Sequence, residues 1–321
     1  MIVVGAHTFQ SHNGYGRWSR SIVESLQRLG YNTWIAPATM VPIPDDLKHL
    51  VKNAKPDIIV FPPFVKSDSP VHFTTYESTI LPSNMVKELR KRKVIAVLSE
   101  YNKTMCRDSG IKNVYVCHPQ VKASYIQEAP FSPFTFTHIG ADNSVPERKR
   151  TSDVIKAFLA AFPVEDNVRL IIKKSPEDQK IPCFDARITS IHDNLESLNA
   201  IYDKTHVGVF PCGQEGWGYC QSDLMARGRP VIVPYYGGPK DFANAANSYI
   251  LPYHMVKTPR KIYQNQGLCA RVKISDISKA MRFAYENKDD TILKGVQAYR
   301  TMLGFSESHM DAKIEQVLQA A

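Results

Sequence analysis

The sequence has few cysteines and no long apolar run, and each shortage excludes a class of protein. Its 321 residues include six cysteines, none in a Cys-x-x-Cys pair, so neither a zinc ribbon nor a redox motif is indicated. No stretch approaches the roughly 18 apolar residues of a membrane span. The apolar residues 1–6 follow no basic segment and are too short for a signal peptide, so they predict a buried strand. We therefore expect a cytoplasmic protein with reduced thiols.

Several catalytic motifs are also absent. The sequence has no Gly-x-Ser-x-Gly, His-Glu-x-x-His or Walker loop, which argues against the enzymes that depend on them. The segment Gly14-Tyr15-Gly16-Arg17-Trp18-Ser19 follows the first predicted strand but lacks the third glycine of a dinucleotide-binding fingerprint.

Negative charge is scarce, above all in the first half of the chain. The net charge is +9, and residues 1–130 hold 16 lysines and arginines against 10 acidic residues. Such an excess favours an anionic partner: a phosphate-bearing acceptor, an anionic membrane surface or nucleic acid. The basic helix predicted over residues 85–92, with the run Lys87–Lys93, would suit an anionic membrane surface. The alternative is that the excess positive charge only keeps the protein surface soluble and binds no partner.

Short apolar runs alternate with amphipathic segments in two successive series. The first predicts strands over 1–6, 31–36, 57–61, 94–98 and 114–117, with helices over 17–29 and 85–92. After the proline-rich residues 129–133, the second predicts strands over 135–139, 169–173, 207–210 and 230–233, with helices over 151–162, 195–202 and 222–226. Residues 275–321 are predicted to be helical.

The two series predict an α/β protein with two parallel-sheet domains. We expect an N-terminal domain over 1–130, a C-terminal domain over 131–303 and a final helix over 304–321. Ligands of such sheets bind at the carboxyl ends of the strands.

The strongest candidate site is a glycine-bearing turn after the strand predicted over 207–210. Glycines let the backbone approach a ligand closely, and the N–H groups that open the next helix can bind a diphosphate. Glu215 and Asp223 flank the turn eight positions apart and could accept hydrogen bonds from sugar hydroxyls. An ordinary strand–turn–helix connection is the alternative. The other candidate donor-binding residues of the turn are Gly216, Trp217, Gly218 and Tyr219.

A second cluster follows the strand predicted over 135–139. Gly140 ends this strand, and Arg148, Lys149 and Arg150 precede the next predicted helix. Cations in this position can neutralise a diphosphate leaving group. A solvated charge cluster in a loop is the alternative.

These segments resemble the retaining glycosyltransferases of family 4, which have the GT-B fold. Residues 215–223 resemble the family's Glu-x7-Glu motif, with Asp223 where the family usually has Glu, and Gly237-Gly238 also matches. The resemblance implies two Rossmann-like domains facing a cleft, with C-terminal helices packing back toward the N-terminal domain. It implies that Glu215 holds the donor sugar, that Asp223 holds the nucleotide ribose, and that Lys149 and Arg148 hold the diphosphate.

The N-terminal half resembles the acceptor side of the same family. The residues that carry this part of the resemblance, as an acceptor or phosphate loop, are Gly14, Tyr15, Gly16, Glu77 and His118. A plain turn at the glycines and a structural role for His118 are the alternatives.

The resemblance implies transfer of a hexosyl or pentosyl group from a nucleotide-diphosphate sugar to an acceptor hydroxyl. We expect no metal, because no Asp-x-Asp follows an apolar strand to hold Mg²⁺ or Mn²⁺ as a GT-A enzyme would need. The acceptor is either an envelope or lipid-linked glycan or a modified DNA base, so the protein would lie peripherally at the membrane or on nucleic acid. A non-catalytic GT-B protein that binds a nucleotide sugar or nucleic acid is the alternative.

Overall fold

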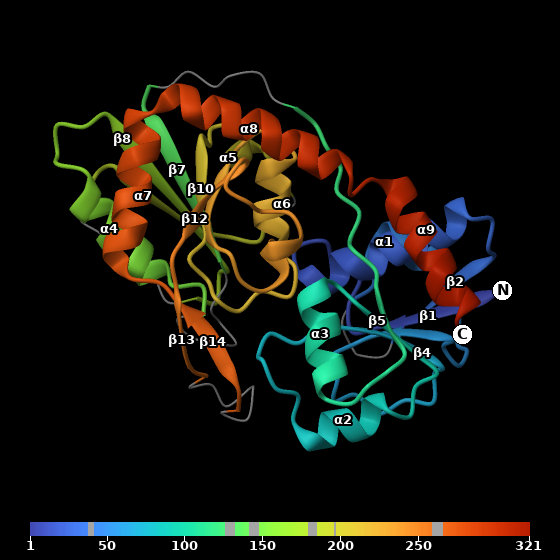
Figure 1. The fold of residues 1–321 in the computed structure, drawn as a ribbon. Helices are drawn as coiled ribbons and strands as arrows, with labels where there is room; N and C mark the ends of the chain where they lie inside the picture. The colour runs from blue at the N-terminus through green and yellow to red at the C-terminus, as the bar shows by residue number, and fades with distance from the viewer. Residues whose placement is uncertain (38–41, 126–131, 141–147, 179–184, 196, 259–265) are drawn as a thin grey trace. The chain divides into compact units, whose positions relative to one another are not determined.

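The computed structural model describes the chain except for residues 38–41, 126–131, 141–147, 179–184, 196 and 259–265, and it divides into two compact units. Unit 1 comprises Met1–Gln120 and Phe305–Ala321, and unit 2 comprises Val121–Gly304. The predicted boundary between residues 130 and 131 lies outside the described residues. Each unit has its own six-stranded sheet with helices packed around it (Figure 1).

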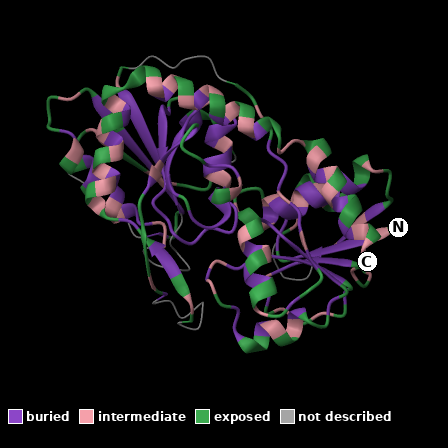
Figure 2. Ribbon diagram, viewed as in Figure 1, coloured by how far each residue is buried: buried purple, intermediate pink, exposed green. Residues whose placement is uncertain are grey.

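The sheet of unit 1 has the strand order β2-β1-β3-β4-β5-β6, and every neighbouring pair is parallel. Its strands come from short apolar runs, and Figure 2 shows them as the buried centre of the unit, as parallel sheets require. The strands are β1 (Ile2–Ala6), β2 (Thr33–Pro37), β3 (Ile58–Val60), β4 (Val71–Thr74), β5 (Val94–Val97) and β6 (Val114–Val116). The helices are α1 (Gly14–Arg28), η1 (Asp45–Leu50), α2 (Ser83–Leu89), α3 (Glu100–Asp108) and α9 (Glu307–Gln319).

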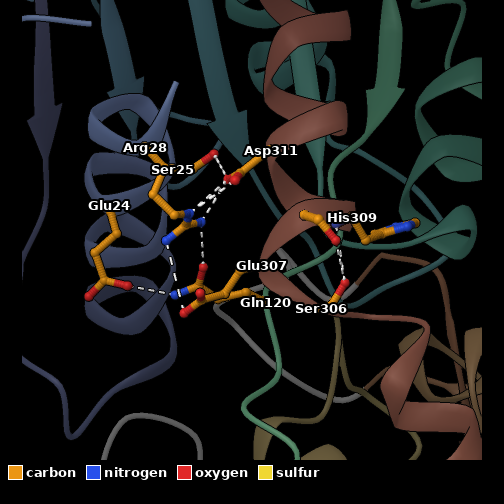
Figure 3. Close-up of polar contacts among 9 residues, drawn as sticks. Glu24, Ser25, Arg28, Gln120, Ser306, Glu307, His309 and Asp311 are labelled. Atoms are coloured by element: carbon orange, nitrogen blue, oxygen red, sulfur yellow. Dashed lines mark hydrogen bonds and ion pairs between the residues drawn. The ribbon is translucent and has the colours of Figure 1, made fainter. Parts of the chain in front are cut away.

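The C-terminal helix α9 packs on α1 within unit 1, which confirms the implied return of the C-terminal helices to the N-terminal domain. Figure 3 shows the polar contacts that join them. Arg28 Nη2 lies 2.7 Å from Asp311 Oδ1, and Ser25 Oγ donates to the same oxygen at 2.6 Å across 286 positions of sequence. Gln120 accepts from Arg28 at 2.9 Å and donates to Glu24 at 2.6 Å.

The sheet of unit 2 has the order β12-β11-β10-β7-β8-β9, again with parallel neighbours. A separate antiparallel pair, β13 with β14, completes the unit. The strands are β7 (Phe134–Ile139), β8 (Val168–Lys174), β9 (Ile188–His192), β10 (Val207–Val209), β11 (Val231–Pro234), β12 (Ser248–Leu251), β13 (His254–Lys257) and β14 (Leu268–Arg271). The helices are α4 (Thr151–Ala161), α5 (Asn199–Tyr202), α6 (Tyr219–Met225), η2 (Gly238–Asp241), α7 (Ile274–Glu286) and α8 (Lys288–Leu303).

The predicted basic helix over 85–92 ends too late in the chain, because α2 spans Ser83–Leu89. The last cations of the run therefore follow the helix. One of them, Arg92, is buried and donates hydrogen bonds to the carbonyl oxygens of Val65 and Ser67. Arg92 thus supports the fold of unit 1 and presents no charge to a partner. Among the described residues, no helix combines the length and apolarity needed to cross a membrane.

Candidate functional site

The candidate site of unit 2 lies where the strand order reverses. Strands β8 and β9 extend the sheet on one side of β7, whereas β10, β11 and β12 extend it on the other side. The neighbours β7 and β10 therefore form a topological switch point, which is where ligands of parallel sheets bind. Gly140 follows β7, and Glu215 lies in the turn that follows β10.

The buried ring of His138 holds the carboxyl end of β7 in place. Its Nδ1 lies 2.7 Å from the carbonyl oxygen of Val209 in β10. Its Nε2 lies 3.1 Å from Oγ1 of Thr151, the first residue of α4. Because Gly140 follows two residues later, these contacts also fix the strand end that carries the candidate site.

The buried carboxylate of Glu215 is the centre of the site. Lys149 Nζ forms an ion pair with one of its oxygens, and Arg148 Nη1 lies 3.9 Å from the other. Arg148 also donates to the carbonyl oxygen of Gln214 at 2.7 Å. The pattern predicted Glu215, Lys149 and Arg148 separately, and the structure brings all three together.

The electrostatics of this group favour an anion. Burial by itself raises the pKa of the Glu215 carboxyl, but the charges of Lys149 and Arg148 hold this pKa below its ordinary value. Glu215 is therefore ionised at neutral pH. Two cations facing one carboxylate leave a net positive charge at the carboxyl ends of β7 and β10.

Glycines allow the close approaches on which the site depends. A Cβ at Gly140 would come within 2.6 Å of Cβ and Cγ of Lys149, so glycine lets this lysine lie against the end of β7. A Cβ at Gly238 would come within 2.3 Å of the carbonyl oxygen of Gly216. The N–H of Gly238 donates to the carbonyl oxygen of Glu215 at 2.8 Å, and this hydrogen bond holds the backbone of the turn in place.

The side chain of Trp217 is a core element of the turn. It is 1% exposed, its Nε1 donates to Ser222 Oγ at 3.2 Å, and its ring packs edge-on against Phe242 at 4.8 Å. These contacts show that the Trp217 side chain supports the turn. Its predicted contact with a donor would therefore be made by its backbone atoms. The pattern indicated the residue but not the burial of its ring.

Helix α6 begins earlier than predicted, at Tyr219, directly after Gly218 in a left-handed conformation with φ 109°. Asp223 lies on this helix and accepts a hydrogen bond from the hydroxyl of Tyr202 at 3.1 Å. Tyr202 is a partner that the sequence did not reveal, because it lies 21 positions earlier in α5.

Arg150 differs from the two cations that precede it. It adopts a left-handed conformation with φ 61° just before α4, its side chain is buried, and it forms an ion pair with Asp153. Burial, with the nearby charge of Arg271 acting in the same direction, lowers its pKa. The acidic residue Asp153, three positions later in the sequence, is the feature that could have indicated that Arg150 supports the start of α4.

The glycine loop of unit 1 has contacts of another kind. Gly14 opens α1, and the N–H of Gly16 donates to Asn13 Oδ1 at 2.7 Å. A Cβ at Gly16 would lie 1.9 Å from the carbonyl oxygen of Gln10, so a larger residue does not fit. The hydroxyl of Tyr15 donates to the carbonyl oxygen of Thr75 at 3.4 Å.

Tyr15 and Glu77 lie near each other although 62 positions separate them in the sequence. Burial, together with the charge of Glu77, raises the pKa of the Tyr15 hydroxyl, which is therefore neutral. Glu77 itself is half-buried after β4. These two predicted acceptor-side residues thus belong to one region of unit 1.

His118 lies beside the start of α9. Its Nδ1 is 3.3 Å from Nε2 of His309, and its ring packs edge-on against Phe305 at 5.1 Å. Burial, with the charge of His118 acting in the same direction, lowers the pKa of His309. These contacts give His118 a role in docking the C-terminal helix, and its predicted acceptor role stays a prediction.

Within the part of the chain that the structure describes, no group of three or more His, Cys, Asp or Glu residues is placed to hold a metal ion. Metal-independent transfer stays a prediction. Five of the six cysteines fall among the described residues, and these five are free.

No protein-family model and no curated protein matches this chain, but solved structures share its fold. HepE from Anabaena, in complex with UDP-glucose, is 9% identical with a TM-score of 0.70 over 100% of both chains. Sucrose-phosphate synthase from Thermosynechococcus elongatus is 12% identical with a TM-score of 0.71 over 99% of this chain and 98% of its own. WaaG, a glycosyltransferase involved in lipopolysaccharide biosynthesis, is 12% identical with a TM-score of 0.69 over 98% and 99%. The chain has the GT-B fold with two Rossmann-like domains, as predicted.

Proposed function

We propose that this protein is a glycosyltransferase that moves a sugar from a nucleotide-diphosphate sugar to an acceptor hydroxyl with retention of anomeric configuration. The observation that carries the proposal is the convergence of Arg148 and Lys149 on the buried Glu215 at the switch point of unit 2. A single charged side chain at a strand end would indicate no function. The grouping of these three charges at the ends of β7 and β10 suits an anionic ligand in a GT-B domain.

In this proposal Arg148 and Lys149 stabilise the departing diphosphate. Negative charge grows on the leaving phosphate as the glycosidic bond breaks, so fixed cations act most strongly in the transition state. The contacts of Arg148 with Gln214 and of Lys149 with Glu215 hold both cations in position before the reaction begins.

Glu215 orients the donor sugar. An ionised carboxylate only accepts hydrogen bonds, and sugar hydroxyls are matching donors. Holding the sugar by its hydroxyls fixes the anomeric carbon relative to the acceptor, which is a large source of rate enhancement. Asp223, placed by α6 and its contact with Tyr202, holds the ribose of the nucleotide.

The reaction proceeds on one face of the sugar. The acceptor oxygen forms a bond to the anomeric carbon while the bond from this carbon to the diphosphate oxygen breaks. The departing phosphate oxygen takes the acceptor proton, so the step needs neither a side-chain nucleophile nor a metal ion. The acceptor hydroxyl belongs to an envelope or lipid-linked glycan or to a modified base of DNA.

A panel of nucleotide sugars tests the proposal, beginning with UDP-glucose because HepE was solved with it. A donor present at about 100 times its dissociation constant should stabilise the protein by about 2.7 kcal/mol, which is read as a raised melting temperature. Hydrolysis or transfer of the donor that binds is then measured. A panel in which no nucleotide sugar raises the melting temperature contradicts the proposal. Stabilisation without any turnover would instead indicate a non-catalytic binding protein.

A further inference from the structure

The pair β13 and β14 forms a basic two-stranded ribbon. Figure 1 shows it extending from unit 2 as a sheet of its own, apart from the six parallel strands. The two strands contain the cations Lys257 and Arg271 and no aspartate or glutamate. Within the described residues of the ribbon, the cations Lys257 and Arg271 are exposed, as is His254.

The positive charges occupy both faces of the ribbon. His254 pairs with Arg271, and Lys257 pairs with Leu268. Directly paired residues share a face and successive residues alternate, so the charge of Arg271 lies on one face and that of Lys257 on the other. A partner that neutralises both Arg271 and Lys257 must therefore surround the ribbon rather than meet one side of it.

Exposed tyrosines stand at the base of the ribbon. Tyr253 directly precedes β13, is 40% exposed and packs edge-on against Tyr236 at 5.5 Å. The neighbouring Tyr235 is 43% exposed, and Lys240 Nζ lies 5.3 Å from the centre of its ring. Exposed aromatic rings beside cations can stack on a base that has been flipped out of a duplex.

The base of the ribbon is attached to the candidate donor turn. The N–H of Ala270 in β14 donates to the carbonyl oxygen of Gly213 at 3.4 Å, two residues before Glu215. A Cβ at Gly213 would lie 2.0 Å from the carbonyl oxygen of Ala270, so this approach requires glycine. Arg150 also donates to the carbonyl oxygen of Val272 at 3.4 Å. A partner at the base of the ribbon would therefore lie close to the turn that carries Glu215.

We propose that the ribbon β13–β14 docks double-stranded nucleic acid, which, if the proposed function holds, brings an acceptor on that nucleic acid to the donor site. The major groove, about 12 Å wide, admits a two-stranded ribbon and lines both of its sides with phosphates. An anionic membrane would meet only one face. The exposed apolar side chains of the ribbon, Met255 at 38% and Leu268 at 40%, form too small a surface for insertion into a bilayer.

The test uses the full chain and the variant Lys257→Glu, with Lys279→Glu as matched control. Lys257 lies at the far end of β13, and Lys279 is an exposed lysine of the same unit on α7. Binding of a fluorescent 20-base-pair DNA duplex is measured between about 50 and 200 mM salt, the range over which phosphate contacts lose most of their affinity. Vesicles that contain phosphatidylserine are titrated in parallel, and donor binding is followed by the melting temperature.

We expect the wild type to bind the duplex, with an affinity that falls steeply as salt rises. Lys257→Glu should weaken binding about tenfold and reduce the salt slope by about one to two, whereas Lys279→Glu should stay within about twofold. Equal losses in both variants, no binding to the duplex, or ribbon-dependent binding to vesicles alone would each overturn the proposal. If no donor raises the melting temperature of the wild type, the proposed glycosyl transfer is contradicted instead. The two failures are therefore distinguishable.

Discussion

The two units share one architecture but carry different chemistry at the carboxyl ends of their strands. In unit 2 the strand ends hold charged side chains that face one another: Arg148, Lys149 and Glu215. In unit 1 the loop after β1 is held by uncharged groups: the N–H of Gly16 donates to Asn13 Oδ1, and the hydroxyl of Tyr15 donates to the carbonyl oxygen of Thr75. The fold thus supplies two equivalent positions, and the charged side chains favour the one in unit 2 for a diphosphate.

Removal of the Lys149 side chain should have the largest effect on turnover. Lys149→Ala deletes one of two cations that stabilise the leaving diphosphate, so kcat should fall about 10² to 10³-fold. The control is Lys156→Ala, an exposed lysine of α4, which should leave kcat within about twofold. Initial rates with saturating donor measure both variants. Near-normal turnover of Lys149→Ala would show that this lysine does not stabilise the leaving diphosphate.

A smaller loss is expected from Gly140→Ala. The new Cβ would come within 2.6 Å of the Lys149 side chain, so the lysine must move away from the end of β7. We expect kcat/KM to fall about tenfold, because a displacement of about 1 Å of a catalytic group can cost up to 10²-fold. Gly304→Ala is the control, since its Cβ would meet only the carbonyl oxygen of Thr301 at 3.3 Å. Equal kinetics for both alanine variants would contradict the close contact.

Tyr15→Phe, a change in unit 1, should have little effect on donor binding. It removes a long hydrogen bond of 3.4 Å from unit 1 and leaves the charges of unit 2 in place. The donor KM should therefore change by less than about threefold, since a hydrogen bond contributes about 1 kcal/mol and a long one less. Donor and acceptor KM values measured separately check this. A larger effect on the donor KM than on the acceptor KM would contradict the assignment of the donor to unit 2.

Asp311→Asn should affect stability and leave the donor KM unchanged. Burial by itself raises the pKa of Asp311, but hydrogen bonds from Arg28 and Ser25 and the charge of Arg28 lower it overall. A lowered pKa means that the ionised carboxylate stabilises the folded state above the unfolded-state pKa, and that this contribution is lost as pH falls through the folded pKa. We expect a loss of about 1 kcal/mol at pH 7.

The pH dependence of this variant is the second part of the test. Denaturant unfolding of wild type and Asp311→Asn should give free energies of unfolding that differ at pH 7 and converge below about pH 4, where aspartate takes up its proton. A difference that stays constant down to pH 3 would show that the Asp311 charge is not its source.

Much of the fold could be predicted, because most strands of both sheets are short apolar runs with clear boundaries. Strand β4 was missed because its four residues include His72, a polar residue that is buried through a contact of its Nε2 with the Phe61 carbonyl oxygen at 3.0 Å. Strand β9 was missed because its side chains are half-buried or exposed and show no apolar pattern. In both cases tertiary contacts, rather than the local pattern, decide the structure.

The candidate site was predictable in its residue types but not in its geometry. Glu215 and Lys149 could be singled out by their motifs, but their ion pair depends on the neighbouring positions of β7 and β10, which the order of strands along the chain does not give. The ribbon β13–β14 was missed, because the contact of Ala270 with Gly213 that anchors it joins residues far apart in the sequence.

A calorimetric titration of the best nucleotide-sugar donor into wild type, Lys149→Ala and Tyr15→Phe tests most directly that the donor binds to unit 2. We expect at least a tenfold loss of donor affinity in Lys149→Ala, because removing a charged partner costs about 1.5 to 3 kcal/mol. In Tyr15→Phe the donor affinity should change by less than about threefold. Unchanged donor affinity in Lys149→Ala together with a clear loss in Tyr15→Phe would show that the donor binds to unit 1 and not to unit 2.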